Sequence, residues 1–152
     1  MAVTTSALDA LEIWGRVPRY DRWLESLNVP VFRGFYIEDL RTMEVGPWEE
    51  RGCNAAILAL NGAEGVTETR VTEIPPGQST TPFKFSLDEL VYVIDGRGIT
   101  TIWAEGYPKK SFEWQTHSLF MLPKNYTYQL SNTQGHRPAR VVNYNCLPVV
   151  MA

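Results

Sequence analysis

The chain has 152 residues, 44% of them hydrophobic and 20% charged, a balance typical of one globular domain that buries its own core. Its formal net charge of −3 offers no basic stripe for phosphate groups, so we expect no nucleic-acid partner. No apolar stretch approaches the roughly 18 residues that cross a bilayer, and the first residues lack the pattern of a secretion signal. We therefore expect a cytoplasmic protein without a membrane partner, in which Cys53 and Cys146 are free thiols.

Aromatic residues are concentrated in the first third of the chain, and we predict an N-terminal extension over residues 1–50. Tyr20, Trp23, Leu24 and Leu27 fall on one face at helical spacing, which predicts a short helix over about residues 18–28. Such an apolar segment requires a surface to pack on. We expect it to cover its own domain or that of the neighbouring copy in a homodimer.

From residue 51 to residue 152, short runs of β-forming residues alternate with turn residues such as Asn61-Gly62 and Asp95-Gly96. The predicted strands are Ala55–Leu60, Thr67–Ile74, Phe83–Phe85, Leu90–Ile94, Ile99–Trp103, Phe112–Trp114, Ser118–Leu122, Tyr126–Leu130 and Arg140–Tyr144. Many short strands at this spacing predict an all-β, antiparallel domain, either a sandwich or a double-sheet jelly roll.

A spaced motif between residues 77 and 96 sharpens this prediction. Gly77 is followed at fixed intervals by Phe83, Phe85, Glu89 and Gly96. The spacing resembles the first signature of the cupin family, Gly-x5-His-x-His-x3-Glu-x6-Gly, with phenylalanine at both histidine positions. The resemblance implies an antiparallel double-sheet jelly-roll barrel that covers roughly residues 55–147.

A second motif resembles the other cupin signature, Gly-x5-Pro-x-Gly-x2-His-x3-Asn. In this chain the corresponding positions hold His117, Pro123, Asn125, Tyr128 and Asn132. Tyr128 therefore stands in place of the third histidine. His117 and Asn125 stand in place of glycines, and we expect them to adopt the left-handed backbone that glycine favours.

In cupins, the His-x-His pair, the glutamate and the later histidine hold a divalent metal inside the barrel. Carried over to this chain, these positions are Phe83, Phe85, Glu89 and Tyr128, of which Glu89 alone is a competent ligand. A catalytic metal site normally needs three or more nitrogen or oxygen donors. The resemblance therefore implies a barrel that has lost its metal site, and we expect neither a metal nor another cofactor.

The same positions predict a small-molecule site, and two interpretations of the barrel interior stay open. In one, the aromatic rings simply fill the barrel. In the other, the pocket stays open and aromatic walls shield Glu89 from water, which would suit it as a general acid or base assisted by Tyr128. Strand parity and the resemblance assign substrate contacts to Phe83, Phe85, Val91, Tyr126 and Leu130.

Three functions follow from these observations. We favour a metal-independent enzyme that binds a small aromatic or conjugated carbonyl compound in the barrel. Its reaction would be a non-redox isomerisation, cyclisation, dehydration or decarboxylation, with Glu89 moving the proton. The first alternative is a cupin that binds or senses a small molecule without turnover. The second is a metal-dependent, dioxygenase-like cupin with atypical ligands.

Overall fold

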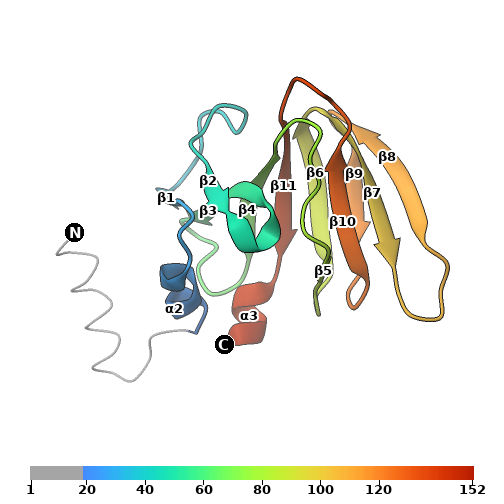
Figure 1. Ribbon diagram of the computed structural model, residues 1–152. Helices are drawn as coiled ribbons and strands as arrows, with labels where there is room; N and C mark the ends of the chain where they lie inside the picture. Colours follow the sequence, from blue (N-terminus) through green and yellow to red (C-terminus); the bar gives the residue numbers. More distant parts are fainter. Residues whose placement is uncertain (1–18) are drawn as a thin grey trace.

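The computed structural model describes residues 19–152, which form two sheets packed face to face (Figure 1). In the larger sheet the strand order is β1-β3-β4-β11-β6-β9, with β2 also paired to β3. The smaller sheet has the order β5-β10-β7-β8. Apart from the parallel pair β1–β3, the strands pair antiparallel. The predicted all-β double sheet is confirmed.

The larger sheet consists of β1 (Val31–Gly34), β2 (Gly46–Trp48), β3 (Cys53–Leu60), β4 (Glu68–Ile74), β6 (Glu89–Asp95), β9 (Leu119–Leu122) and β11 (Ala139–Asn145). The smaller sheet consists of β5 (Phe83–Lys84), β7 (Arg97–Trp103), β8 (Lys110–Gln115) and β10 (Thr127–Asn132). Two helices, α2 (Arg19–Ser26) and α3 (Leu147–Met151), and a 3₁₀ turn η1 (Glu49–Arg51) complete the described region. Neither helix of this region has the length to cross a bilayer.

Every strand predicted from the sequence is present, and the structure adds β1, β2 and α3. The two added strands are short, and β2 contains Pro47, which a local pattern reports as a turn. Both pair with the same edge of β3. The pairing of β1 joins residues far apart in the sequence, such as Val31 and Ile57, and the local pattern could not predict it.

Helix α2 confirms the predicted short helix and buries Tyr20 and Leu24. These side chains belong to a cluster with Trp48, Ile57 and, at its margin, Met151 of α3. The described part of the N-terminal segment thus packs against the β2–β3 end of its own domain. The homodimer stays a prediction.

Two turns have the backbone conformation that the second motif predicts. His117 has φ 76° and Asn125 has φ 65°, and they are the non-glycine residues of positive φ within residues 19–152. The backbone N–H of Asn125 donates to the carbonyl of Phe85 at 2.6 Å. The left-handed turn before β10 therefore secures the end of β5, where the first motif lies.

Asn132, the last residue of the second motif, is buried at the end of β10. Its side-chain amide donates to the carbonyls of Ile74 at 3.0 Å and Arg137 at 2.8 Å, and its oxygen accepts from the backbone N–H of Gln134 at 2.9 Å. One side chain thus satisfies backbone groups of β4 and of the loop between β10 and β11, which fixes this loop against β4.

The core between the sheets is made of side chains from both. Its buried members are Ile74, Val91, Val93, Trp114, Leu122, Tyr128, Leu130, Ala139 and Val141. At the β3–β4 end of the same interior the side chains become polar and charged, and this end contains the candidate site.

Candidate functional site

Glu89, the first residue of β6, is only 2% exposed and sits in a network of hydrogen-bond donors. The guanidinium of Arg70 in β4 donates to both of its carboxylate oxygens, at 3.0 and 3.1 Å. The amides of Asn143 and Asn145 in β11 donate to it at 3.2 and 2.9 Å. Since β11 lies between β4 and β6, inward side chains of three adjacent strands meet here. The sequence predicted aromatic walls around this carboxylate, whereas its immediate partners are donors.

Glu68 is a second buried carboxylate in the same network, and the sequence analysis missed it. It accepts hydrogen bonds from Asn145 at 2.9 Å and from the hydroxyl of Tyr20 at 3.1 Å, and it lies 3.6 Å from Arg70. Arg70 therefore bridges two acids. Burial by itself lowers the pKa of Arg70, but the charges of Glu89 and Glu68 outweigh that effect and raise it. The guanidinium is firmly cationic.

Arg51, at the end of η1, provides a second cation near the first. One of its nitrogens donates to the hydroxyl of Tyr128 at 2.9 Å, and its guanidinium lies 3.5 Å from the ring centre of Phe83 and 5.0 Å from that of Trp48. Within residues 19–152, no carboxylate pairs with it. Burial, and then repulsion from Arg70, lower the pKa of Arg51. Among the described residues it is a partly desolvated cation that forms no direct ion pair.

Tyr128 is held in its protonated form. Burial, and then the charge of Glu89, raise the pKa of its phenol to about 12. The hydroxyl accepts from Arg51, so its own proton is free to donate. Its ring meets that of Phe83 edge to face, with centroids 6.0 Å apart. Tyr128 is therefore a hydrogen-bond donor and not an ionised metal ligand.

These groups surround a cavity of about 20 Å³ inside the barrel. It is lined by Trp48, Arg51, Cys53, Arg70, Thr72, Thr80, Thr81, Tyr128, Leu130 and Asn143. Such a volume holds about one water-sized group, well below the roughly 300–1,000 Å³ of typical ligand pockets. The barrel interior is mostly filled, and much of the filling is arginine, not only the aromatic rings that the sequence suggested.

The structure brings together most of the residues predicted to form the site. Tyr128 and Leu130 line the cavity, and Phe83 covers Arg51. Phe85 packs beside Phe83, with ring centroids 5.9 Å apart. Val91 is fully buried in the adjoining core.

Tyr126 lies apart from the other predicted site residues. It precedes the first residue of β10, so the alternation that places Tyr128 and Leu130 inward does not extend to it. Its ring packs near that of Tyr107, a side chain that is 67% exposed, and it is not among the residues that line the cavity.

Two alternations in the sequence could have pointed to the missed residues. In β4, Glu68, Arg70 and Thr72 occupy every second position and are buried. In β11, Asn143 and Asn145 do the same. Charged or amide side chains on the buried face of a strand need partners on a neighbouring strand. The register supplies them, since it pairs Asn145 with Glu68 across β11 and β4.

The residues at the cupin metal positions do not fit a divalent metal. Phe83 and Phe85 carry no donor atoms, and within the described residues no three His, Cys, Asp or Glu side chains converge. Arg70 already occupies both oxygens of Glu89, and its positive charge would repel a metal cation there. A guanidinium thus neutralises the acid that a metal would bind in a metal-containing relative.

The arrangement of the sheets matches solved structures of known fold. The cupin domain of Schizosaccharomyces pombe Cnp3 superposes with a TM-score of 0.57 at 16% identity, covering 71% of this chain and 71% of that one. This chain has the cupin fold. The polyketide cyclase RemF from Streptomyces resistomycificus has a TM-score of 0.58 at 14% identity over 74% of this chain and 79% of its own.

A further cupin match is the vicilin of Solanum melongena, a structure that revealed different anionic ligands in structurally similar pockets. It has a TM-score of 0.55 and 20% identity, and it covers 62% of this chain and 27% of that one. No protein-family profile and no curated protein matches the sequence. At these identities the likeness establishes the fold alone.

We predict that Arg70→Met lowers the free energy of unfolding by about 3–5 kcal/mol, because it leaves two buried carboxylates without their counter-charge. Arg41→Met is the matched control, since Arg41 pairs with Asp39 at 65% exposure and its loss should cost far less. Adding Glu89→Gln to Arg70→Met should restore part of the loss. Urea denaturation measures all three, and equal losses in the two arginine variants would contradict a buried network.

A second prediction concerns alkaline pH. Because the pKa of Tyr128 rises from 10.0 to about 12 in the folded state, its contribution to stability is complete below pH 10 and is lost as pH rises towards 12. The expected loss is about 2–3 kcal/mol. Burial and Glu68 also raise the pKa of Tyr20, which acts in the same direction. In Tyr128→Phe, stability measured by denaturation should therefore fall less steeply above pH 10 than in the parent; parallel curves would count against the assignment.

Proposed function

We propose that this protein is a metal-independent cupin that binds a small organic anion at the mouth of its barrel. The ligand would be a carboxylate or conjugated carbonyl compound with an aromatic part. The observation that carries this proposal is Arg51, a partly buried guanidinium without a carboxylate partner among the described residues. Leaving a cation desolvated and unpaired is costly, and an anionic ligand would offset that cost.

The donors around Arg51 suit an oxyanion. Tyr128, whose hydroxyl proton is free to donate, lines the cavity together with two further hydroxyl-bearing residues, Thr80 and Thr81. Arginine binds carboxylates through paired N–H groups, and charge-assisted bonds of this kind are about twice as strong as neutral ones. Phe83, already in contact with the guanidinium, offers a face to the aromatic part of the ligand.

The cavity size limits how such a ligand binds. About 20 Å³ admits a carboxylate oxygen or a comparable group, and not a whole ring. The charged end would therefore enter between Arg51 and Tyr128, with the body at the mouth, where Thr81 is exposed and Phe83 is half-buried. The S. melongena vicilin, with its anionic ligands, lends support by analogy of fold.

We predict that cinnamate binds more tightly than cinnamamide, its neutral analogue, in NMR titrations of the purified protein. Arg51→Gln should weaken cinnamate binding by at least about tenfold, because it removes a charge-assisted pair worth roughly 1.5–3 kcal/mol. It should also abolish the preference over the amide. Arg97→Gln, on an exposed side chain of β7, is the matched control. The proposal fails if the two ligands bind equally or if both variants behave as the parent does.

A catalytic role of Glu89 in a non-redox proton transfer is a second candidate. It is favoured by the nearness of a buried acid to Tyr128, whose pKa the charge of Glu89 raises, and one cupin neighbour is a polyketide cyclase. Against it, both oxygens of Glu89 already accept hydrogen bonds. Proton transfer would require at least one of these bonds to break. The side chains present disfavour the metal-dependent alternative, because no three His, Cys, Asp or Glu side chains converge within the described residues.

Deuterium exchange into phenylpyruvate in D2O, followed by NMR, tests this second candidate. If Glu89 moves protons, the parent protein should accelerate exchange at the carbon beside the carbonyl, and Glu89→Gln should abolish the acceleration. If Glu89 is purely structural, exchange should equal that of buffer in both proteins. Cinnamate binding by the same variant, expected within about threefold of the parent, separates lost chemistry from lost folding.

A further inference from the structure

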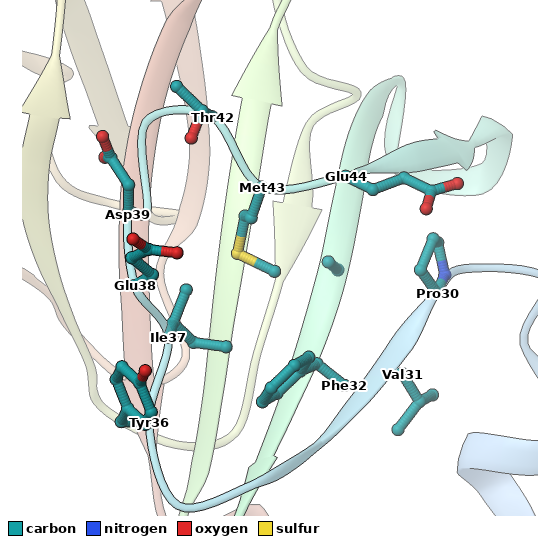
Figure 2. A pocket seen from close by; sticks show the side chains of 11 residues that line it. Pro30, Val31, Phe32, Tyr36, Ile37, Glu38, Asp39, Thr42, Met43 and Glu44 are labelled. Atoms are coloured by element: carbon teal, nitrogen blue, oxygen red, sulfur yellow. The ribbon is translucent and has the colours of Figure 1, made fainter.

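A larger hollow lies on the opposite face of β3 from the barrel cavity. Along this strand Cys53 lines the cavity, whereas Ala56, which has the opposite parity, lies at the hollow. The hollow measures about 990 Å³ and is lined by Pro30, Val31, Phe32, Tyr36, Ile37, Glu38, Asp39, Thr42, Met43, Glu44 and Ala56 (Figure 2). Its size is at the upper end of the range of small-molecule pockets.

The outer wall of the hollow is the segment 35–45, which we call the arch; it connects β1 to β2. Arg140 of β11 fixes the arch, because one of its nitrogens donates to the carbonyls of Leu40 and Met43, each at 2.9 Å. The same guanidinium is bound at 2.9 Å by Glu73, and both of these side chains are mostly buried. A partly buried ion pair therefore anchors the arch that forms the outer wall of the hollow.

Apolar and aromatic side chains form most of the inner wall. In Figure 2, Phe32 and Tyr36 stand on either side of Ile37, and Met43 projects into the space above them. Tyr36 is 73% exposed and Phe32 is 39% exposed. Two solvent-exposed aromatic rings at one hollow form an apolar patch, and such patches are typical of binding sites.

The charged groups at the hollow are all acidic. Glu38 and Glu44 lie at opposite sides of it in Figure 2, and no lysine or arginine is among the residues that line it. Asp39 is neutralised by Arg41 at 3.0 Å, whereas within residues 19–152 neither Glu38 nor Glu44 forms an ion pair. Carboxylates beside aromatic faces attract cations, since both present negative potential.

We propose that this hollow binds a small organic ammonium ion with an apolar body. The apolar body would pack on Phe32, Ile37 and Met43, and the ammonium group would lie between a carboxylate and the ring of Tyr36. The site is separate from the barrel mouth and has the opposite charge preference, so it is independent of the function proposed for Arg51.

Three probes of equal length test the proposal: 4-phenylbutylamine, 4-phenylbutanol and 4-phenylbutyrate, titrated at pH 7 and low ionic strength by NMR. The amine should bind at least about tenfold more tightly than the alcohol, with an affinity that falls as salt is added. The double variant Glu38→Gln/Glu44→Gln should reduce amine binding to the level of the alcohol. The double variant Glu105→Gln/Glu113→Gln makes the same change in net charge beside and within β8 of the other sheet and should leave binding unchanged.

The adjacent residues Phe35 and Tyr36 supply a matched aromatic pair. Both are strongly exposed, at 82% and 73%, so neither substitution threatens the fold, but only Tyr36 lines the hollow. Tyr36→Ala should weaken amine binding roughly two- to fivefold, and Phe35→Ala should not.

Several results would overturn the site. These are equal binding of amine and alcohol, equal effects of Tyr36→Ala and Phe35→Ala, or the absence of saturable amine binding below about 10 mM. The test also includes an N-terminally acetylated tetrapeptide that contains one lysine with a free, cationic side chain. If this peptide binds more tightly than the amine, the assignment to a small molecule is overturned.

Discussion

The interior of this barrel depends on one guanidinium. Arg70 contacts Glu89 at 3.0 Å and Glu68 at 3.6 Å, and the amides of Asn143 and Asn145 and the hydroxyl of Tyr20 also donate to these acids. Two carboxylates in a closed interior are tolerable only with a cation between them. In a metal-containing cupin a divalent ion supplies that charge, whereas here a side chain of β4 does. The charge balance in this part of the barrel is thereby kept by protein side chains.

With Arg70 in the place of a metal ion, the space left for a ligand lies near the barrel mouth and not at its centre. Since Arg70 and its partners fill the centre, only about 20 Å³ is left, and it lies beside Arg51 on the η1 turn. Arg51 is in contact with Phe83 and Tyr128, two of the positions that hold metal ligands in the family pattern. Two positions that hold metal ligands in the family pattern thus contact a second cation, which forms no ion pair among the described residues. Binding of an anion at the mouth follows more readily from this arrangement than proton transfer by a fully engaged Glu89.

A partly buried arginine also organises the outer face. Arg140, paired with Glu73, holds the carbonyls of the arch and so anchors the outer wall of the hollow beside β1. The two arginines are on adjacent strands of the same sheet, but their guanidinium groups serve opposite faces. Arg70 pairs with the two acids of the interior, and Arg140 binds the arch on the outer face. The result is a basic group at the barrel mouth and acidic groups at the outer hollow, so the two proposed sites would have opposite ligand preferences.

The sequence by itself determined the strands from β3 to β11, the left-handed turns at His117 and Asn125, and the loss of the histidine ligands. These are local properties, because motif spacing, strand periodicity and backbone preference depend on residues close together in the sequence. It also indicated Phe83, Glu89 and Tyr128 as neighbours, through the resemblance to the cupin signatures.

Only the tertiary structure decided what surrounds Glu89. Arg70, Glu68 and the two asparagines come from strands whose register is set by pairing across the sheet, and no local pattern states which strand lies next to which. The same holds for Arg51, which the fold brings to Tyr128, 77 residues further along the chain. The sequence shows which residues carry charge. Once such a residue is buried it needs a partner, and the order and register of the strands determine which side chain lies close enough to be that partner.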